Sequence, residues 1–316
     1  MSAGSPPSAA PTIAAMPPMA HAPARIALLG AALLVGAATT PTACTGDGEC
    51  ASCGAPATVG ALQSPDLTET SGVAASARHD GVFYAHNDSG DSSRFFAFSR
   101  EGDDLATFKV QNAQNVDWED IAVGPCDAGS CVYIADIGDN ELARLAVTLY
   151  RVAEPDAIVA GETTLPSERI VFTYPEGAQD AEVLLVHPDT GVVTVVTKVA
   201  DGPAAIYELP LPLTTGMTLM AAKKGELMPP AGDARFTAGS IAPDASAILM
   251  RTHDRLFLYP MEPGQSAAEA LAGAACSLRV ADEMLGEAVT WLADGSGFMT
   301  AGEGEGAAIH VTTCDS

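Results

Sequence analysis

DWEDIAV, residues 117–123, is one of five related segments whose recurrence decides the fold. From each segment to the next, the third residue advances by 48, 63, 57 and 48 positions. The full set is ETSGVAA (69–75), DWEDIAV (117–123), DAEVLLV (180–186), TAGSIAP (237–243) and LGEAVTW (285–291). Repetition at a period of about 50 residues is typical of arrays in which each repeat forms one small unit of secondary structure.

Each segment is followed by a turn and by further short runs rich in Val, Ile, Tyr and Phe, a composition that predicts strands. Beyond residue 58 no amphipathic pattern is long enough to predict a helix. Each repeat is therefore predicted to form three strands. A fourth strand precedes the next segment, in LATFKV (105–110), ERIVFTY (168–174), GMTLMAA (216–222) and CSLRVA (276–281). Together these predict an all-β, five-bladed β-propeller.

The last repeat has no fourth strand of its own. We expect ATVGAL (57–62) to supply it, so that an N-terminal strand closes the ring and leaves no open sheet edge. The propeller domain would then span residues 57–316. The alternative is a six-bladed propeller, with a further blade inside the 63-residue interval between Glu119 and Glu182.

The first 43 residues contain no acidic residue, and a single charge at Arg25 precedes an apolar run of signal-peptide length. Residues 1–43 are therefore predicted to be a signal peptide. TPTAC (40–44) resembles the lipobox of bacterial lipoproteins, which implies lipidation of Cys44 and an anchor in the cell envelope. Pro41 stands where that motif usually has an aliphatic residue, so secretion is the alternative. Residues 44–56, rich in Gly, Ala and Thr, are predicted to be a flexible tether.

Once Cys44 is set aside, six of the seven cysteines remain, an even number that suits disulfides in an exported protein. Cys126 and Cys131 flank a four-residue turn and are predicted to form a disulfide across a hairpin. Cys50 and Cys53 form a C-x-x-C without a second such pair, so a small disulfide is favoured over a zinc site. The spacing leaves open how these two pair with Cys276 and Cys314.

The charge is strongly negative, with 40 acidic against 15 basic residues and a net charge of −25. Such a surface repels phosphate backbones, so the sequence predicts no nucleic-acid partner. Clustered carboxylates suit Ca²⁺ or another divalent cation as a cofactor, although they also simply confer solubility. We expect a monomer that meets the membrane only through its lipid anchor. Its small-molecule ligand or protein partner is left unidentified.

In a blade, the innermost strand and the second strand are antiparallel, so the start of the first lies beside the end of the second. This predicts one polar face around the mouth of the central channel. The expected members are Glu69, Asp88, Asp117, Asp136, Asp139, Asn140, Lys198, Arg251, Glu287 and Glu303.

Glutamate recurs at the third position of three segments, in Glu119, Glu182 and Glu287, although it is a poor strand former. These three are the predicted metal ligands, and Glu119 and Glu182 are the candidate catalytic residues. The fourth segment has Gly239 at that position. The alternative is that these acids only hold neighbouring blades together. Beside Glu119, Trp118 is expected to pack between blades and Asp120 to be a surface or capping acid.

Taken together, HNDSG (86–90), YIADIGDN (133–140), YRVAEP (150–155) and the five segments resemble a family of secreted bacterial propellers that is largely uncharacterised. The opening Glu-x-Ser-Gly and the Asp-x-Glu of the second repeat also resemble the esterase-like phytase and SdiA-regulated propeller families. The resemblance implies a propeller compatible with calcium, and hydrolytic activity by name. Two functions follow: a binding propeller with an acidic, cation-holding mouth, or a metal-dependent hydrolase of phosphate esters or lactones.

Overall fold

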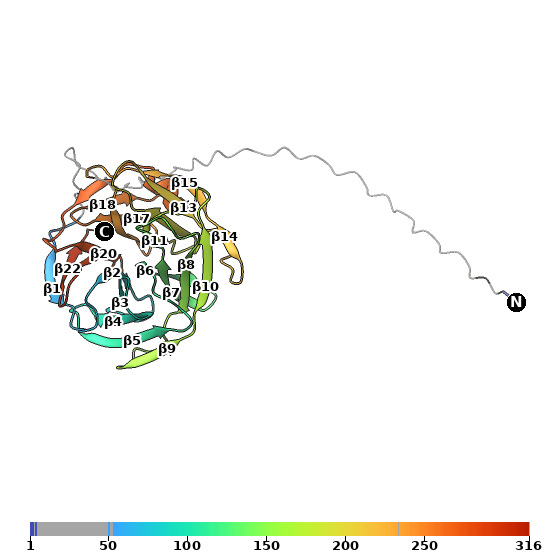
Figure 1. Ribbon diagram of the computed structural model, residues 1–316, viewed down its shortest axis with the longest axis horizontal. Coiled ribbons are helices and arrows are strands. Elements are labelled where there is room, and N and C mark those ends of the chain that lie inside the picture. Colours follow the sequence, from blue (N-terminus) through green and yellow to red (C-terminus); the bar gives the residue numbers. More distant parts are fainter. Residues whose placement is uncertain (3, 5–49, 51–52, 233, 316) are drawn as a thin grey trace, which may run out of the picture. The chain divides into compact units, whose positions relative to one another are not determined.

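A computed structural model of the chain describes residues 1, 2, 4, 50, 53–232 and 234–315. In this part of the chain, five β-sheets surround a common axis (Figure 1). Blade 1 contains β2 (Thr70–Ala75), β3 (Val82–Asn87), β4 (Arg94–Ser99) and β5 (Asp104–Val110). Blade 2 contains β6 (Trp118–Cys126), β7 (Gly129–Asp136), β8 (Val147–Ala153) and β10 (Glu168–Thr173).

Blade 3 contains β11 (Ala181–Val186), β12 (Val193–Thr197), β13 (Ala204–Glu208) and β15 (Ala222–Leu227). Blade 4 contains β16 (Phe236–Ile241), β17 (Ala247–Thr252), β18 (Leu256–Pro260) and β19 (Cys276–Leu278). Blade 5 contains β20 (Gly286–Trp291), β21 (Gly297–Gly302), β22 (Ala308–Thr313) and β1 (Ala57–Ala61). The innermost strands β2, β6, β11, β16 and β20 contact one another in that circular order and line the channel. The predicted all-β class and the count of five blades agree with this arrangement.

Two short strands explain the long intervals between repeats. β9 (Glu162–Leu165) leaves the second repeat and pairs in parallel with β5 of blade 1. β14 (Thr218–Met220) leaves the third repeat and pairs in parallel with β10 of blade 2. The 63-residue interval therefore accommodates β9 instead of a sixth blade. The prediction that residues 216–222 form the fourth strand of their own repeat is wrong, because β15 takes that place.

Two disulfides tie the segment before the propeller to its last two blades. Cys50 bonds to Cys276 and Cys53 bonds to Cys314, so the expected disulfide between Cys50 and Cys53 is wrong. The reason lies in the backbone, because Cys50 N donates to Ser277 O at 3.0 Å and therefore lies against blade 4. The chain then continues into β1, which pairs antiparallel with β22 at the rim of blade 5 (Figure 1).

Cys126 and Cys131 form the predicted disulfide across the hairpin of β6 and β7. Three disulfides together are consistent with an oxidising environment. The described residues contain no helix with the length and hydropathy to cross a membrane. Their one helix, α1 (Ala267–Leu271), is a single short turn capped by Ser266. Cys44 and almost all of the predicted signal peptide lie outside the described residues.

The core lies between the blades, where the faces of adjacent sheets meet. Trp118 is fully buried among residues of blades 1 and 2, which confirms its expected packing role. Its indole Nε1 donates to Gln114 O at 2.9 Å, and its ring lies edge-on to His86 at 5.6 Å between centroids. Trp118 thereby fixes the entrance of β6, where the acidic residues of the second repeat lie.

Candidate cation site at the channel mouth

All five innermost strands carry a β-bulge near their first residue. A bulge inserts one extra residue into a strand and changes the direction of its side chain. The bulged residues are Ser71, Glu119, Glu182, Thr237 and Glu287. Three glutamates thus recur at one structural position around the mouth, as the repeat predicted.

In blade 4 the bulged residue is Thr237. The alignment of the five segments had put Gly239 at this position, so it was wrong by two residues. The two hydroxyl-bearing members bind the neighbouring blade through its backbone. Ser71 Oγ donates to Glu119 O at 2.6 Å, and Thr237 Oγ1 donates to Gly286 O at 3.0 Å. Where the repeat lacks an acid, this position joins blades directly.

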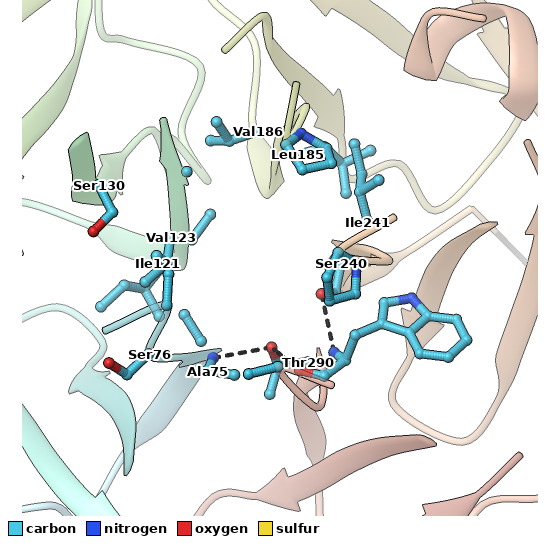
Figure 2. A pocket seen from close by; sticks show the side chains of 18 of the residues that line it. Ala75, Ser76, Ile121, Val123, Ser130, Leu185, Val186, Ser240, Ile241 and Thr290 are labelled. Atoms are coloured by element: carbon cyan, nitrogen blue, oxygen red, sulfur yellow. Dashed lines mark hydrogen bonds between the residues drawn. The ribbon is translucent and has the colours of Figure 1, made fainter. Parts of the chain in front are cut away.

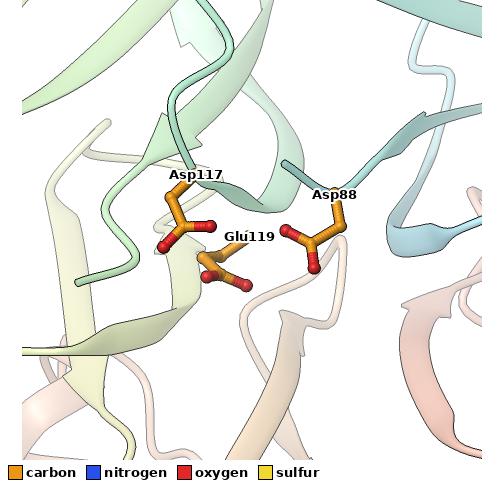
Figure 3. Close-up of side chains that lie close together, drawn as sticks. All are labelled: Asp88, Asp117 and Glu119. Carbon is orange, nitrogen blue, oxygen red and sulfur yellow. The ribbon is translucent and has the colours of Figure 1, made fainter. Parts of the chain in front are cut away.

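Asp88, Asp117 and Glu119 form the closest acidic cluster of the described residues. One carboxylate oxygen from each lies within 4.8 Å of the others, and the three side chains point toward one space (Figure 3). Asp88 follows β3, Asp117 precedes β6 and Glu119 is the bulged residue of β6. Glu119 is buried, whereas the two aspartates are half-buried.

Backbone contacts set this geometry. Asp88 N donates to Glu69 O at 2.9 Å, and Asp117 N donates to Asp136 Oδ1 at 3.1 Å. Gly138 closes over the cluster so tightly that a Cβ atom there would lie 2.0 Å from Glu119 Oε1. A glycine is therefore required at position 138 for the carboxylates to keep their places.

Burial and neighbouring negative charges raise the pKa values of several acidic residues at the channel mouth. Burial raises the pKa of Glu119 well above its usual value, and the negative charges of Glu182 and Asp88 add to this effect. Burial and the charge of Asp88 raise the pKa of Asp117 to about 6. Burial raises the pKa of Glu182 to about 8, although Lys198 opposes the shift. The acids repel one another, so a cation or protons must compensate their charge.

Among the described residues, Lys198 and His253 each lie beside a different glutamate of the mouth. Lys198 forms an ion pair with Glu182. Burial lowers the pKa of the lysine, but Glu182 and the charges of Glu287 and Glu119 together raise it above its usual value. His253 Nδ1 lies 3.0 Å from Glu287 Oε1. Glu303 belongs to the same face, because burial and the charge of Glu287 raise its pKa. In the described ion pairs, neither Lys198 nor His253 contacts the cluster of Asp88, Asp117 and Glu119.

Other residues predicted at the mouth have structural roles. Arg251 is fully buried between blades 4 and 5, where it pairs with Glu283 and donates to Ala288 O at 2.9 Å. Its guanidinium group is therefore engaged between these blades. Nothing in the repeat pattern pointed to Glu283, since it lies between strands and outside the five segments.

The loop after β7 accounts for three further residues. Asp136 Oδ1 lies 2.8 Å from Arg144 Nη2 in an ion pair, so its charge is already compensated. Asp139 accepts from Ala143 N at 2.9 Å and from Arg144 N at 2.8 Å and thereby holds the loop. Asn140 is exposed. Arg144 had no signal in the sequence, because its position in an irregular loop has no counterpart in the other repeats.

Asp120 is neither a surface nor a capping acid, contrary to expectation, because it is fully buried. One carboxylate oxygen accepts from Ile121 N at 2.8 Å. The other accepts from Leu184 N of blade 3 at 2.9 Å and from Gly239 N of blade 4 at 3.4 Å. Burial raises the pKa of Asp120 well above its usual value although these bonds oppose the shift. Asp120 therefore joins three blades across the channel, beneath the cluster.

The raised pKa values predict that, in a chelator, stability falls as pH rises from 4 to 6. The folded chain keeps the Asp117 proton until about pH 6, whereas the unfolded chain loses it near its ordinary value of 3.8. The stability contributed by that proton is therefore lost across this window. One proton corresponds to a fall in melting temperature of about 3–5 °C per pH unit. Differential scanning fluorimetry measures this, and a constant or rising melting temperature would contradict it.

The cluster of Asp88, Asp117 and Glu119 fits a hard divalent cation. Its donors are carboxylate oxygens, which suit calcium, magnesium or manganese and not the softer metals. Gly138 leaves these carboxylates the room that a side chain at this position would fill. No protein-family model and no curated protein matches this sequence.

Proposed function

We propose that this chain is an exported, lipid-anchored β-propeller that binds a divalent cation at Asp88, Asp117 and Glu119. With the cation bound, the channel mouth would hold a small ligand or protein partner. The observation that carries the proposal is three carboxylates within 4.8 Å of one another, with raised pKa values. The nearby basic groups pair elsewhere, Lys198 with Glu182 and Arg144 with Asp136.

Calcium is the preferred cation of the proposal. It takes six to eight oxygen ligands, more than three carboxylates supply unless all bind through both oxygens. Water or an oxygen-bearing ligand would complete the shell from the mouth side. Ligand binding at the mouth would thus depend on the cation.

Export and anchoring are part of the same proposal. Three disulfides support an oxidising location, and the sequence of residues 40–44 supports lipidation of Cys44. We further propose that β1 closes the ring, with the two disulfides that precede it keeping it on blade 5. The acidic charge supports a monomer without nucleic-acid partners.

Calcium at one hundred times its Kd is expected to raise the melting temperature by about 5–10 °C, from a gain of about 2.7 kcal/mol. Asp117→Asn should weaken the affinity measured by isothermal titration calorimetry on the order of 10–100-fold. The matched control is Asp104→Asn, at an exposed strand position outside the mouth, which should leave the affinity unchanged. Absence of saturable binding of calcium, magnesium and manganese alike would refute the cation site.

The pKa of Glu182 favours a second candidate, a metal-dependent hydrolase of lactones or phosphate esters. A carboxyl group that titrates at about 8 can exchange protons with a substrate near neutral pH. A bound divalent ion would polarise the substrate carbonyl or phosphoryl group. Turnover of generic lactone or phosphoester substrates that is lost in Glu182→Gln, with calcium affinity retained, would establish the hydrolase. If the folded protein bound calcium but turned over none of these substrates, the hydrolase would be refuted and the binding function would stand.

A further inference from the structure

We propose a second binding site at the opposite end of the channel, for a small, uncharged and mainly apolar molecule that carries a hydrogen-bond acceptor such as a carbonyl group. A cavity of about 300 Å³ opens there, and all five innermost strands contribute to its wall (Figure 2). This volume lies at the lower end of the range of small-ligand pockets.

The cavity is separate from the acidic mouth. On β6 the mouth residue Glu119 lies near the start of the strand, whereas Ile121 and Val123 line the cavity further along it. Between the two levels Asp120 crosses the channel to Leu184 and Gly239. A molecule in the cavity is thus divided from a cation at the mouth by a buried carboxylate and its hydrogen bonds.

The walls exclude charge. The labelled aliphatic side chains around the open space include those of Ile121, Val123, Leu185, Val186 and Ile241 (Figure 2). The described lining contains no Asp, Glu, Lys, Arg or His. An ion that entered would lose its hydration without a partner, so only an uncharged molecule fits. Apolar cavities of such size take up small apolar molecules in preference to water.

The hydroxyl groups of the cavity lining determine which polar group a ligand should carry. Ser76 Oγ and Ser130 Oγ both donate to the buried carboxylate of Glu154, so their hydrogens are engaged. Thr290 Oγ1 accepts from Ala75 N at 3.2 Å and donates to a backbone carbonyl.

Ser240 differs from these three. Its Oγ accepts from Trp291 N at 3.1 Å, and among the described residues nothing accepts its hydroxyl hydrogen (Figure 2). Of these four hydroxyl groups, only that of Ser240 therefore keeps a hydrogen for a ligand. A ligand that presents a carbonyl oxygen to Ser240 satisfies it.

Prodan, an uncharged naphthyl ketone whose emission shifts in apolar surroundings, tests the site in titrations of the full chain. We expect saturable binding of one molecule, and no binding of the anionic naphthalene sulfonate dye ANS. Val123→Phe and Ile241→Phe place a ring into the cavity from opposite walls and should each abolish the Prodan response. Ser240→Ala should weaken it by about two- to tenfold. The matched control is Val159→Phe, at a residue that is 63% exposed, which should bind as the parent does.

Asp117→Asn separates the two sites, because it should alter calcium affinity and leave Prodan affinity unchanged. Melting curves identify any variant that fails to fold, and the remaining variants then decide. Absence of saturable Prodan binding would overturn the proposal. Equal binding by the parent and by folded cavity variants would also overturn it, as would Prodan affinity that follows Asp117→Asn.

Discussion

Asp120→Ala is expected to lower the free energy of unfolding by about 3–5 kcal/mol. The carboxylate is fully buried and accepts from Ile121 N, Leu184 N and Gly239 N. Alanine would leave these backbone donors without a partner in a space too enclosed for easy hydration. Each orphaned donor costs about 1–3 kcal/mol.

Two comparisons make the Asp120 experiment specific. Asp120→Asn keeps one oxygen acceptor of the same shape, so about half of the loss should return. Asp80→Ala removes an exposed aspartate and should change the stability by no more than about 0.5 kcal/mol. Urea denaturation measures all three variants. If Asp120→Ala proved no more destabilising than Asp80→Ala, the carboxylate would not hold the blades together.

The double variant Cys50→Ser with Cys276→Ser is expected to destabilise the chain by about 4 kcal/mol. The Cys53–Cys314 disulfide stays intact, so Cys50–Cys276 closes a further loop of about 41 residues, 3 from Cys50 to Cys53 and 38 from Cys276 to Cys314. For a domain of this size the loss corresponds to a fall in melting temperature of about 8–16 °C.

The hairpin disulfide provides the matched control. Cys126 and Cys131 are only 5 residues apart, so their double serine variant should lose about 2 kcal/mol. Thermal unfolding of both double variants under the same non-reducing conditions gives the comparison. An equal or smaller loss for the long-range pair would mean that its cross-link does not restrain the unfolded chain as supposed.

The repeat made much of the acidic site predictable from sequence. A bulge at the same place in every innermost strand leaves a recurrent side chain, which is why Glu119, Glu182 and Glu287 could be aligned. The antiparallel hairpin placed Asp88 beside them. The fourth repeat was misaligned at Gly239, since it has Thr237 where the others have Ser or Glu and its apolar neighbours match in either register.

Other features leave no trace in residue types. The partners of Asp120 are backbone N–H groups, which every residue except proline possesses. Strand-forming composition predicted a strand within residues 216–222 but not the sheet that it joins. The number of cysteines indicated disulfides, whereas the pairing of Cys50 and Cys53 depends on which blade edge each one meets.

The parallel pairings of β9 and β14 bear on how such a chain can evolve. Each of these strands completes the outer edge of the preceding blade. Deleting or duplicating the second or third repeat would therefore leave one sheet without its last strand and another with a surplus one. For these repeats, a change of blade number by simple gain or loss of a genetic module is disfavoured. Their sequences are expected to diverge in place, as parts of one inherited unit.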